Sequence, residues 1–167
     1  MPKTKGFTLI ELVMVIVLLG ILAVYAAPRL GNIFSMKGAS FTDKLRADIR
    51  YAQNLAMTSG LRSRVTLTAG SYAVTSSATS TCSSFNPARD PATGGSFSVS
   101  LTGSYAGITL TLPAMTCLEY DSLGRPYDCT GLGGVCSAVL SGMSITVNSS
   151  GVAGSVLVSS QTGAVNK

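Results

Sequence analysis

The chain has no histidine among its 167 residues, and charged residues make up only 11% of it. Histidine is the side chain that most often serves as a general base or metal ligand near neutral pH. The many serines have no visible activating base beside them. The sequence therefore predicts a protein that is not an enzyme and that carries no cofactor.

Metal and nucleic-acid sites also lack their usual signatures. The chain has no C-x-x-C pair, which together with the missing histidine argues against zinc. Asp121 and Asp128 flank a turn and offer calcium ligands, but aspartates at turns usually bond the backbone, so we predict no metal. The basic residues are scattered rather than clustered, which argues against a nucleic-acid surface. They include Arg46, Arg50, Arg62, Arg64, Arg89 and Arg125.

The most informative segment is the apolar run from Phe7 to Ala27, which Lys3, Lys5 and Gly6 precede. A helix of about 20 apolar residues is long enough to cross a membrane. Basic residues on its N-terminal side keep that end cytoplasmic. A secretory signal peptide is cut after its apolar run, whereas here the candidate cleavage glycine comes before it. Cleavage at this glycine would leave the membrane helix attached to the product.

This arrangement closely resembles the class III leader of type IV pilins and pseudopilins. In that family a membrane peptidase cuts after the glycine and methylates the new N-terminus. The resemblance implies cleavage between Gly6 and Phe7 and N-methylation of Phe7. It also implies that Glu11 is the carboxylate used in subunit assembly and that Pro28 kinks the helix.

Glu11 is the one formal charge within the apolar run. A carboxylate in the apolar part of a membrane helix is costly unless it is paired or reaches the interface. One interpretation is a residue that reaches the interface from near the helix start. The family resemblance implies another, an ion pair with the N-terminal amine of Phe7 on a neighbouring subunit, which sets the axial register. Cleavage must then come first, because the precursor lacks this amine.

The four cysteines all follow the apolar run, on the side of the membrane where disulfides persist. They are Cys82, Cys117, Cys129 and Cys136. We predict disulfides, but four cysteines allow three connectivities and spacing alone does not choose among them. The short, glycine-rich loop between Cys129 and Cys136 favours the pairs Cys129–Cys136 and Cys82–Cys117.

The hydrophobic period changes along the rest of the chain. Gly31 and Gly38 lower helix propensity just past Pro28, but helical periodicity returns over residues 41–57, with Gly60 as a stop signal. The apolar stripe of this helix comprises Phe41, Leu45, Ile49, Ala52 and Ala56. From Arg62 onward the period is two, typical of strands with one wet face. The strand candidates are 64–68, 72–76, 96–101, 108–112, 118–120, 144–148 and 155–159.

These patterns predict an α+β fold in which one long N-terminal helix packs on an antiparallel β-sheet head. The first half of the helix is transmembrane and the second half is amphipathic. Residues 75–95 are polar and proline-rich, which predicts a long exposed loop, and residues 121–126 have turn chemistry. The expected parts are a leader at 1–6, a transmembrane and assembly helix at 7–27, its periplasmic continuation at 28–60 and the head at 61–167.

The later sequence narrows the resemblance. The segments LRADIRYAQNLAMTSG, EYDSLGRP and ITVNSSGVAGSVLVSSQTGAV look like those of minor pilins and of the H-type pseudopilins of type II secretion. Within that group the chain is most similar to minor pilins of the mannose-sensitive haemagglutinin pilus type. It departs from major pilins because it has no disulfide loop at its very end, which favours a low-abundance subunit.

The sequence therefore predicts a structural minor pilin that initiates, caps or decorates a type IV pilus after cleavage by prepilin peptidase. Its expected partners are other pilin subunits, that peptidase and the inner membrane, with the head in the periplasm before assembly. One alternative is the H-type pseudopilin of a type II secretion system. Another is a DNA-binding minor pilin, which needs a basic patch for phosphate contacts. Its candidate contacts are Arg62, Arg64, Arg89 and Arg125.

Overall fold

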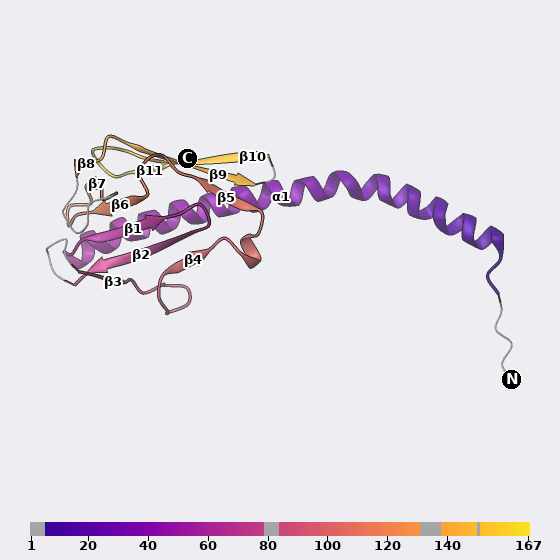
Figure 1. Cartoon of the computed structure of the whole chain (residues 1–167), viewed down its shortest axis with the longest axis horizontal. Helices are drawn as coiled ribbons and strands as arrows, with labels where there is room; N and C mark the ends of the chain where they lie inside the picture. The colour runs from indigo at the N-terminus through magenta and orange to yellow at the C-terminus, as the bar shows by residue number, and fades with distance from the viewer. Residues whose placement is uncertain (1–5, 79–83, 131–137, 150) are drawn as a thin grey trace.

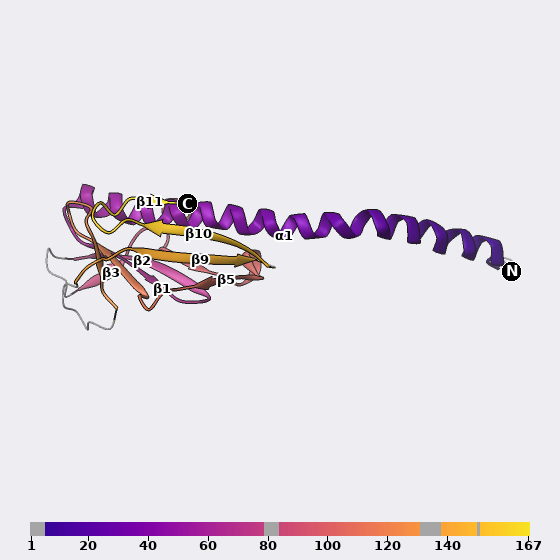
Figure 2. The same ribbon diagram turned by 90° about the horizontal axis from the view of Figure 1, so that it is seen from above.

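The longest element is the helix α1 (Leu9–Ser59), whose 51 residues extend about 75 Å. The computed structural model describes residues 6–78, 84–130, 138–149 and 151–167, with the side chains of 27–35 and 138–139 excepted. Thr8 caps the helix with extended backbone, and Gly60 ends it in the left-handed region at φ 69°. The N-terminal half projects away from the head, and the second half lies along one flank of it (Figures 1 and 2).

The other elements are short strands and one turn of 3₁₀ helix. In chain order they are β1 (Ser63–Leu67), β2 (Ser71–Ser77), β3 (Phe85–Pro87), β4 (Ser98–Ser100), η1 (Gly103–Tyr105), β5 (Ile108–Thr111), β6 (Cys117–Tyr120), β7 (Pro126–Asp128), β8 (Ala138–Val139), β9 (Met143–Ser149), β10 (Val152–Val158) and β11 (Val165–Asn166).

Within the described residues, the strands form two antiparallel sheets. The larger has seven strands in the order β3-β2-β1-β6-β7-β8, with β4 also paired to β2. The smaller has four strands in the order β11-β10-β9-β5. The central pairs are β1 with β2, where Val65 lies opposite Val74, and β9 with β10, where Ile145 lies opposite Val156. These alternating apolar positions direct one face of each sheet toward α1.

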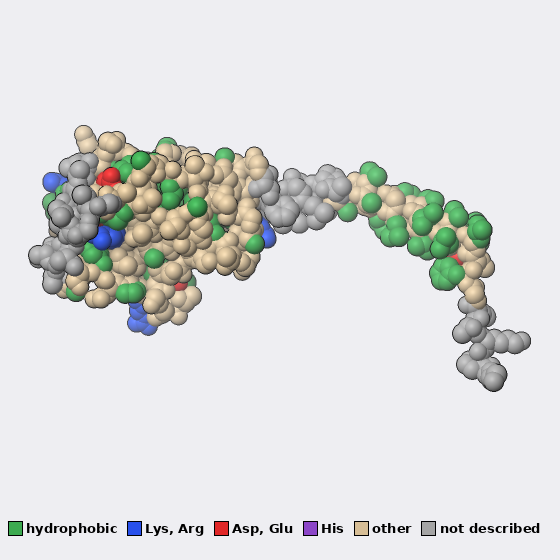
Figure 3. Space-filling view, viewed as in Figure 1, with side chains coloured by type: hydrophobic (Ala, Val, Ile, Leu, Met, Phe, Trp, Pro, Cys, Tyr) green, Lys and Arg blue, Asp and Glu red, His purple; other side chains and the backbone are tan. Residues whose placement is uncertain are grey.

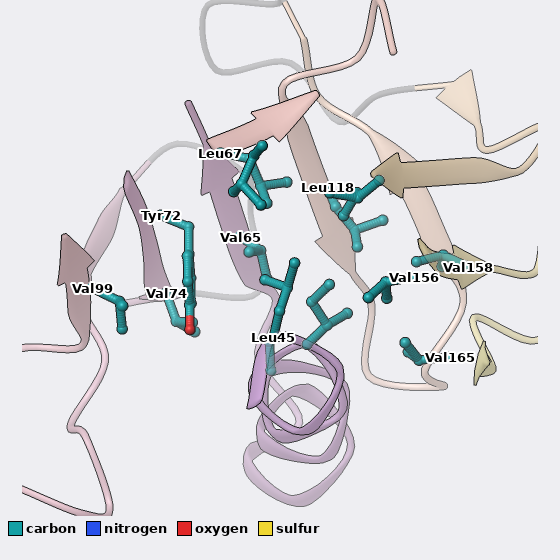
Figure 4. Packing of buried hydrophobic residues seen from close by; sticks show 14 of the residues in the cluster. Leu45, Val65, Leu67, Tyr72, Val74, Val99, Leu118, Val156, Val158 and Val165 are labelled. Atoms are coloured by element: carbon teal, nitrogen blue, oxygen red, sulfur yellow. The ribbon is translucent and has the colours of Figure 1, made fainter. Parts of the chain in front are cut away.

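The core lies between α1 and the two sheets (Figure 4). The predicted apolar stripe is confirmed, because its five members are at most 1% exposed: Phe41, Leu45, Ile49, Ala52 and Ala56. From the sheets, Val65, Leu118 and Val156 face it and are fully buried. One stripe of the second half of α1 therefore lies in the core although the helix runs along one flank of the head (Figure 2). The predicted α+β fold class is confirmed.

Side-chain hydrogen bonds tie α1 to both sheets. Gln53 donates to the carbonyls of Gly124 and Thr162, each at 2.9 Å. Tyr72, which is 2% exposed, donates a hydrogen bond to Asp48 on the helix. Burial and this carboxylate raise the pKa of Tyr72 well above its usual range, so the hydroxyl stays a donor over the physiological pH range.

The segment 75–95 differs from the exposed loop that its composition predicts. β2 continues to Ser77, and β3 pairs with its end, where Thr75 lies opposite Pro87. Ala88 is only 5% exposed. Proline fits here because β3 is an edge strand and needs no ladder hydrogen bond on its outer side. Pairing with the edge of β2 therefore makes residues 85–87 a strand, although the composition of the segment favours irregular structure.

Two glycines allow α1 and the β9–β10 hairpin to approach closely. A Cβ on Gly38 would lie 2.8 Å from the Cβ of Ser149, and a Cβ on Gly154 would lie 2.5 Å from Oγ1 of Thr42. Thr42 is 1% exposed and bonds the carbonyl of Gly38 at 2.8 Å. The backbones of α1 and the β9–β10 hairpin thus come close together where α1 enters the head, because neither glycine has a side chain to hold them apart.

We predict that Gly154→Ala destabilises the folded head by about 1–3 kcal/mol, because the added methyl group overlaps the Thr42 side chain in a filled core. Gly70→Ala is the matched control, since nothing lies within 4 Å of a Cβ there. Urea unfolding of the full chain in detergent measures both. Adding Thr42→Ala to Gly154→Ala should restore part of the loss, and equal stabilities of the two single glycine variants would contradict the close contact.

Candidate assembly site

The residues before α1 form the candidate site for processing. Gly6 and Phe7 are exposed, and the Phe7 side chain keeps 72% of its surface. A Cβ on Gly6 would meet nothing within 4 Å, and its φ is not in the left-handed region. The fold itself therefore gives no reason for glycine at position 6, so any requirement for glycine there comes from outside the folded chain.

Thr8 holds the first turn of α1 in place. Its Oγ1 accepts a hydrogen bond from the amide of Glu11 at 3.4 Å, and its carbonyl accepts from the amides of Glu11 and Leu12 at 3.1 and 3.2 Å. Threonine followed three residues later by glutamate is the pattern of a helix capping box. The spacing of Thr8 and Glu11 was the signal for this cap, which the sequence analysis missed.

Glu11 therefore lies at the third position of the helix and its side chain is exposed. Within the described residues, no hydrogen bond or ion pair is made by its carboxylate. The positive end of the helix dipole favours a carboxylate here, which offsets part of the cost of placing it beside apolar residues. The site thus presents an oriented negative charge four positions after Phe7.

The rest of the first half of α1 is apolar on every side. Over Leu9–Ala26 the mean hydropathy is 2.8 and none of the residues is buried, so this helix is long and apolar enough to cross a membrane. On the face that Figure 3 shows, apolar side chains run along this half, whereas on the head they are scattered. Each large apolar side chain left in water costs about 1.5–3 kcal/mol relative to burial. The projecting half must therefore be covered by lipid or by protein.

Pro28 lies within α1, which continues through it without a break. Proline has no amide to bond one turn back, so this part of the helix lacks one backbone hydrogen bond. Figure 1 shows that α1 bows as it leaves the head. The kink at Pro28 itself stays a prediction.

Two of the four arginines considered as DNA contacts are engaged inside the head. Arg62 and Arg64 each place a guanidinium nitrogen 2.8 Å from the Glu119 carboxylate, which is fully buried. Arg64 also stacks on Phe85 at 3.8 Å, and Arg62 lies 5.0 Å from the Tyr127 ring. Removing both arginines would take away the two positive charges that face the buried Glu119 carboxylate, which is costly. These two arginines therefore link β1, β3, β6 and β7, and neutralising them would test the fold more than any DNA contact.

The two aspartates considered as calcium ligands bond protein groups. Asp121 accepts from the amides of Leu123 and Arg125, at 2.9 and 2.8 Å, and from the Tyr127 hydroxyl at 3.0 Å. Asp128 accepts from the amide of Thr130 at 2.8 Å. Among the described residues, no group of three acidic, histidine or cysteine side chains is placed to hold a metal.

The predicted disulfide pairing is wrong at Cys117 and Cys129, which the structure joins to each other. The register of the β6–β7 hairpin explains the bond. Leu118 lies opposite Asp128, so the next pair outward is Cys117 with Cys129, whose Cα atoms are 5.0 Å apart. The pairs Cys82–Cys117 and Cys129–Cys136 are thereby excluded, while Cys82 and Cys136 themselves lie outside the described residues. The equal spacing of Cys117 and Cys129 about the turn at 121–125 was the missed signal.

Comparisons with known proteins matched the N-terminal segment to a family model and the fold to a solved structure. The prokaryotic N-terminal methylation motif matches residues 1–27. No curated protein matches the chain. Among solved structures, the fold is similar to that of the minor pseudopilin EpsH from the Type 2 Secretion System of Vibrio cholerae. The TM-score is 0.51 at 12% identity, and the match covers 80% of this chain and 94% of that chain.

The chain thus combines a prokaryotic N-terminal methylation motif on a long apolar helix with an α+β head whose fold is similar to that of a minor pseudopilin. Both findings agree with the resemblance to type IV pilins and pseudopilins described from the sequence.

We predict that peptide mapping without reduction recovers Cys117 linked to Cys129, because the hairpin register brings these two cysteines together. Replacing both by serine should lower the free energy of unfolding by about 2–4 kcal/mol, as is usual for loss of a native disulfide. Recovery of Cys117 linked to Cys82 instead would contradict the hairpin register.

Proposed function

We propose that this protein is a minor pilin, a low-abundance structural subunit that takes part in type IV pilus assembly after prepilin peptidase has cleaved it. One observation carries the proposal. The methylation motif covers the start of one continuous helix. The apolar first half of this helix is wholly exposed, whereas one stripe of its second half is buried in the head. Such a helix suits a subunit that is stored in a membrane and then transferred to a helical bundle.

In this proposal the peptidase cuts between Gly6 and Phe7, and Phe7 becomes the methylated N-terminus. The exposure of both residues and the absence of any structural need for glycine at position 6 support this assignment. Residues 7–27 then hold the subunit in the inner membrane. Residues 28–60 continue the helix on the periplasmic side, where residues 61–167 form the head. Assembly moves the apolar half from lipid to neighbouring subunits.

Glu11 selects the position of the incoming subunit. Its charge stands in the first turn of α1, on the apolar half of the helix, where an unpaired carboxylate is costly. The amine created at Phe7 of a neighbouring subunit supplies the opposite charge. This pair forms only after cleavage, so it admits processed subunits and places their helices at one axial offset.

A second candidate function is that of a pseudopilin in a type II secretion system. The fold similarity to the minor pseudopilin EpsH favours it. The two functions differ in the assembly that the subunit joins, a type IV pilus or a type II secretion system. The chemistry of the helix is the same in both. A deletion strain separates them, because loss of surface pili with normal protein secretion supports the pilin, and the reverse supports the pseudopilin.

We predict that the protein from a host with prepilin peptidase begins at Phe7 and carries one added methyl group. Intact-mass and N-terminal peptide analysis of filament material measures this. Gly6→Val should leave the precursor uncut, and Gly20→Val is the matched control because nothing lies near a Cβ at either glycine. Assembled material that retains Met1 would refute the proposed function.

We predict that Glu11→Gln is cleaved and stays in the membrane but enters filaments about tenfold less often. The neutral amide cannot pair with the Phe7 amine, and a loss of about 1.4 kcal/mol already changes an equilibrium tenfold. Immunogold labelling of sheared filaments measures incorporation against total membrane protein. Asp43→Asn is the control, since this carboxylate lies on the head, 49% exposed. Normal incorporation of Glu11→Gln would show that the ion pair is not needed.

A further inference from the structure

The strand β10 is paired on one side along its whole length and on the other side only at its end. Its seven residues all pair with β9, whereas β11 pairs with Leu157 and Val158 alone. Figure 2 shows β11 beside the end of β10, on the side where α1 runs. On that side, residues 152–156 have no neighbouring strand within the described part of the chain.

The hydrogen bonds beside β11 show which way the backbone groups of β10 point. The amide of Ser159 donates to the carbonyl of Ala164 at 2.9 Å, so Ser159 turns its backbone toward the β11 side. In an antiparallel strand every second residue does the same, and the N–H and C=O groups of Ala153 and Ser155 therefore point out of the sheet. Neither residue makes a backbone hydrogen bond on that side with another described residue. We call this part of β10, defined by Ala153 and Ser155, the open edge.

The open edge is accessible and lies beside α1. Ala153 is exposed and Ser155 is partly exposed. Between them, Gly154 holds β10 against the helix, because a Cβ there would lie 2.5 Å from Oγ1 of Thr42. A strand added at the open edge would therefore lie in line with β11 and alongside α1.

The open edge has none of the usual protection against strand pairing. Natural edge strands are blocked by lysine, by proline or by a covering segment. Residues 152–156 read VAGSV, without a charge or a proline. At the opposite edge of the same sheet, the amide of Leu110 in β5 instead donates to the carbonyl of Ala69 at 3.1 Å. An alternating row of backbone donors and acceptors is matched by another extended backbone, whereas a phosphate offers acceptors only.

We propose that, after assembly, the open edge pairs with an extended segment of a neighbouring subunit that has its own apolar assembly helix. This inference rests on the proposed function, because the packing of other subunits around α1 brings them alongside this edge. Ala153 and Ser155 each offer one N–H donor and one C=O acceptor to the added strand. The added strand holds the head to its neighbour, whereas the ion pair at Glu11 acts between the helices alone.

The first test removes a donor that the fold itself does not use. Ala153→Pro deletes the amide and puts a ring in its place, and proline is tolerated on an edge strand whose amide faces solvent. Ser100→Pro is the matched control, since Ser100 is exposed on β4, at an edge of the other sheet, and its amide bonds no other described residue. We expect both full-length variants to be cleaved and to unfold in urea like the wild type. Incorporation into filaments should fall several-fold for Ala153→Pro only.

The second test identifies the added strand. Benzoylphenylalanine is introduced in place of Ala153 in the full chain, activated by light in sheared filaments, and the crosslinked peptide is sequenced by mass spectrometry. The same reagent in place of Ser100 is the control. We expect one predominant peptide from another subunit with an apolar assembly helix, formed several-fold more at Ala153 than at Ser100. Crosslinks only to lipid, to the chain's own residues or to a protein without such a helix would overturn the proposal.

The other outcomes are also decisive. Normal incorporation of a stable Ala153→Pro variant would overturn the strand pairing and leave the proposed function intact. Absence of the wild-type chain from filaments would remove the proposed function and the strand pairing with it. If Ala153→Pro unfolds at lower urea concentration than Ser100→Pro, the crosslink decides, because a peptide from a neighbouring subunit supports the pairing and the lack of one overturns it.

Discussion

Phe41, Leu45 and Ile49 lie almost fully buried between two sheets that are separate in their strand pairing, so the helix joins them into one head. Burying each of these side chains contributes about 1.5–3 kcal/mol. The close approach at Gly38 and Gly154 lets the β9–β10 hairpin lie directly on the helix. The strands β1, β2, β6, β9 and β10 contribute further apolar residues to the same core. Without the stripe, neither sheet has a second layer to cover its apolar face.

The two halves of α1 meet different surroundings although they are one helix. Over Leu9–Ala26 no residue is buried, and the apolar surface surrounds the helix on all sides. In the head, only one stripe is apolar, and the other faces carry charged residues such as Asp43 and Arg46, which form an ion pair at 3.1 Å. An all-round apolar surface suits lipid or a bundle of like helices, whereas a single stripe suits one sheet-lined core. The change of pattern along α1 thus separates the half that needs an apolar partner outside the head from the half that folds the head.

Local patterns predicted much of this structure because they depend on short-range periodicity. The stripe from Phe41 to Ala56, the long helix and the antiparallel strands each follow from spacing along the chain. The disulfide did not, because its geometry depends on the register of β6 with β7, which comes from the turn between them. The Arg62–Glu119–Arg64 cluster was missed for a similar reason. Its members are 55 and 57 residues apart, and only strand pairing brings them together.

The continuity of α1 connects the charge near its start to the position of the head. The capping pattern of Thr8 and Glu11 fixes the first turn, and the head holds the helix from Gly38 onward. From Glu11 to Phe41 is a rise of about 45 Å along the helix. In the proposed function, the axial offset set at Glu11 is therefore passed to the head through the intact helix between them. Pro28 lies in that interval and removes one backbone hydrogen bond, so the interval can bend with less cost than the rest. In the proposed function, the pairing of charges at Glu11 sets the axial position, and a bend in this interval sets the orientation of the head.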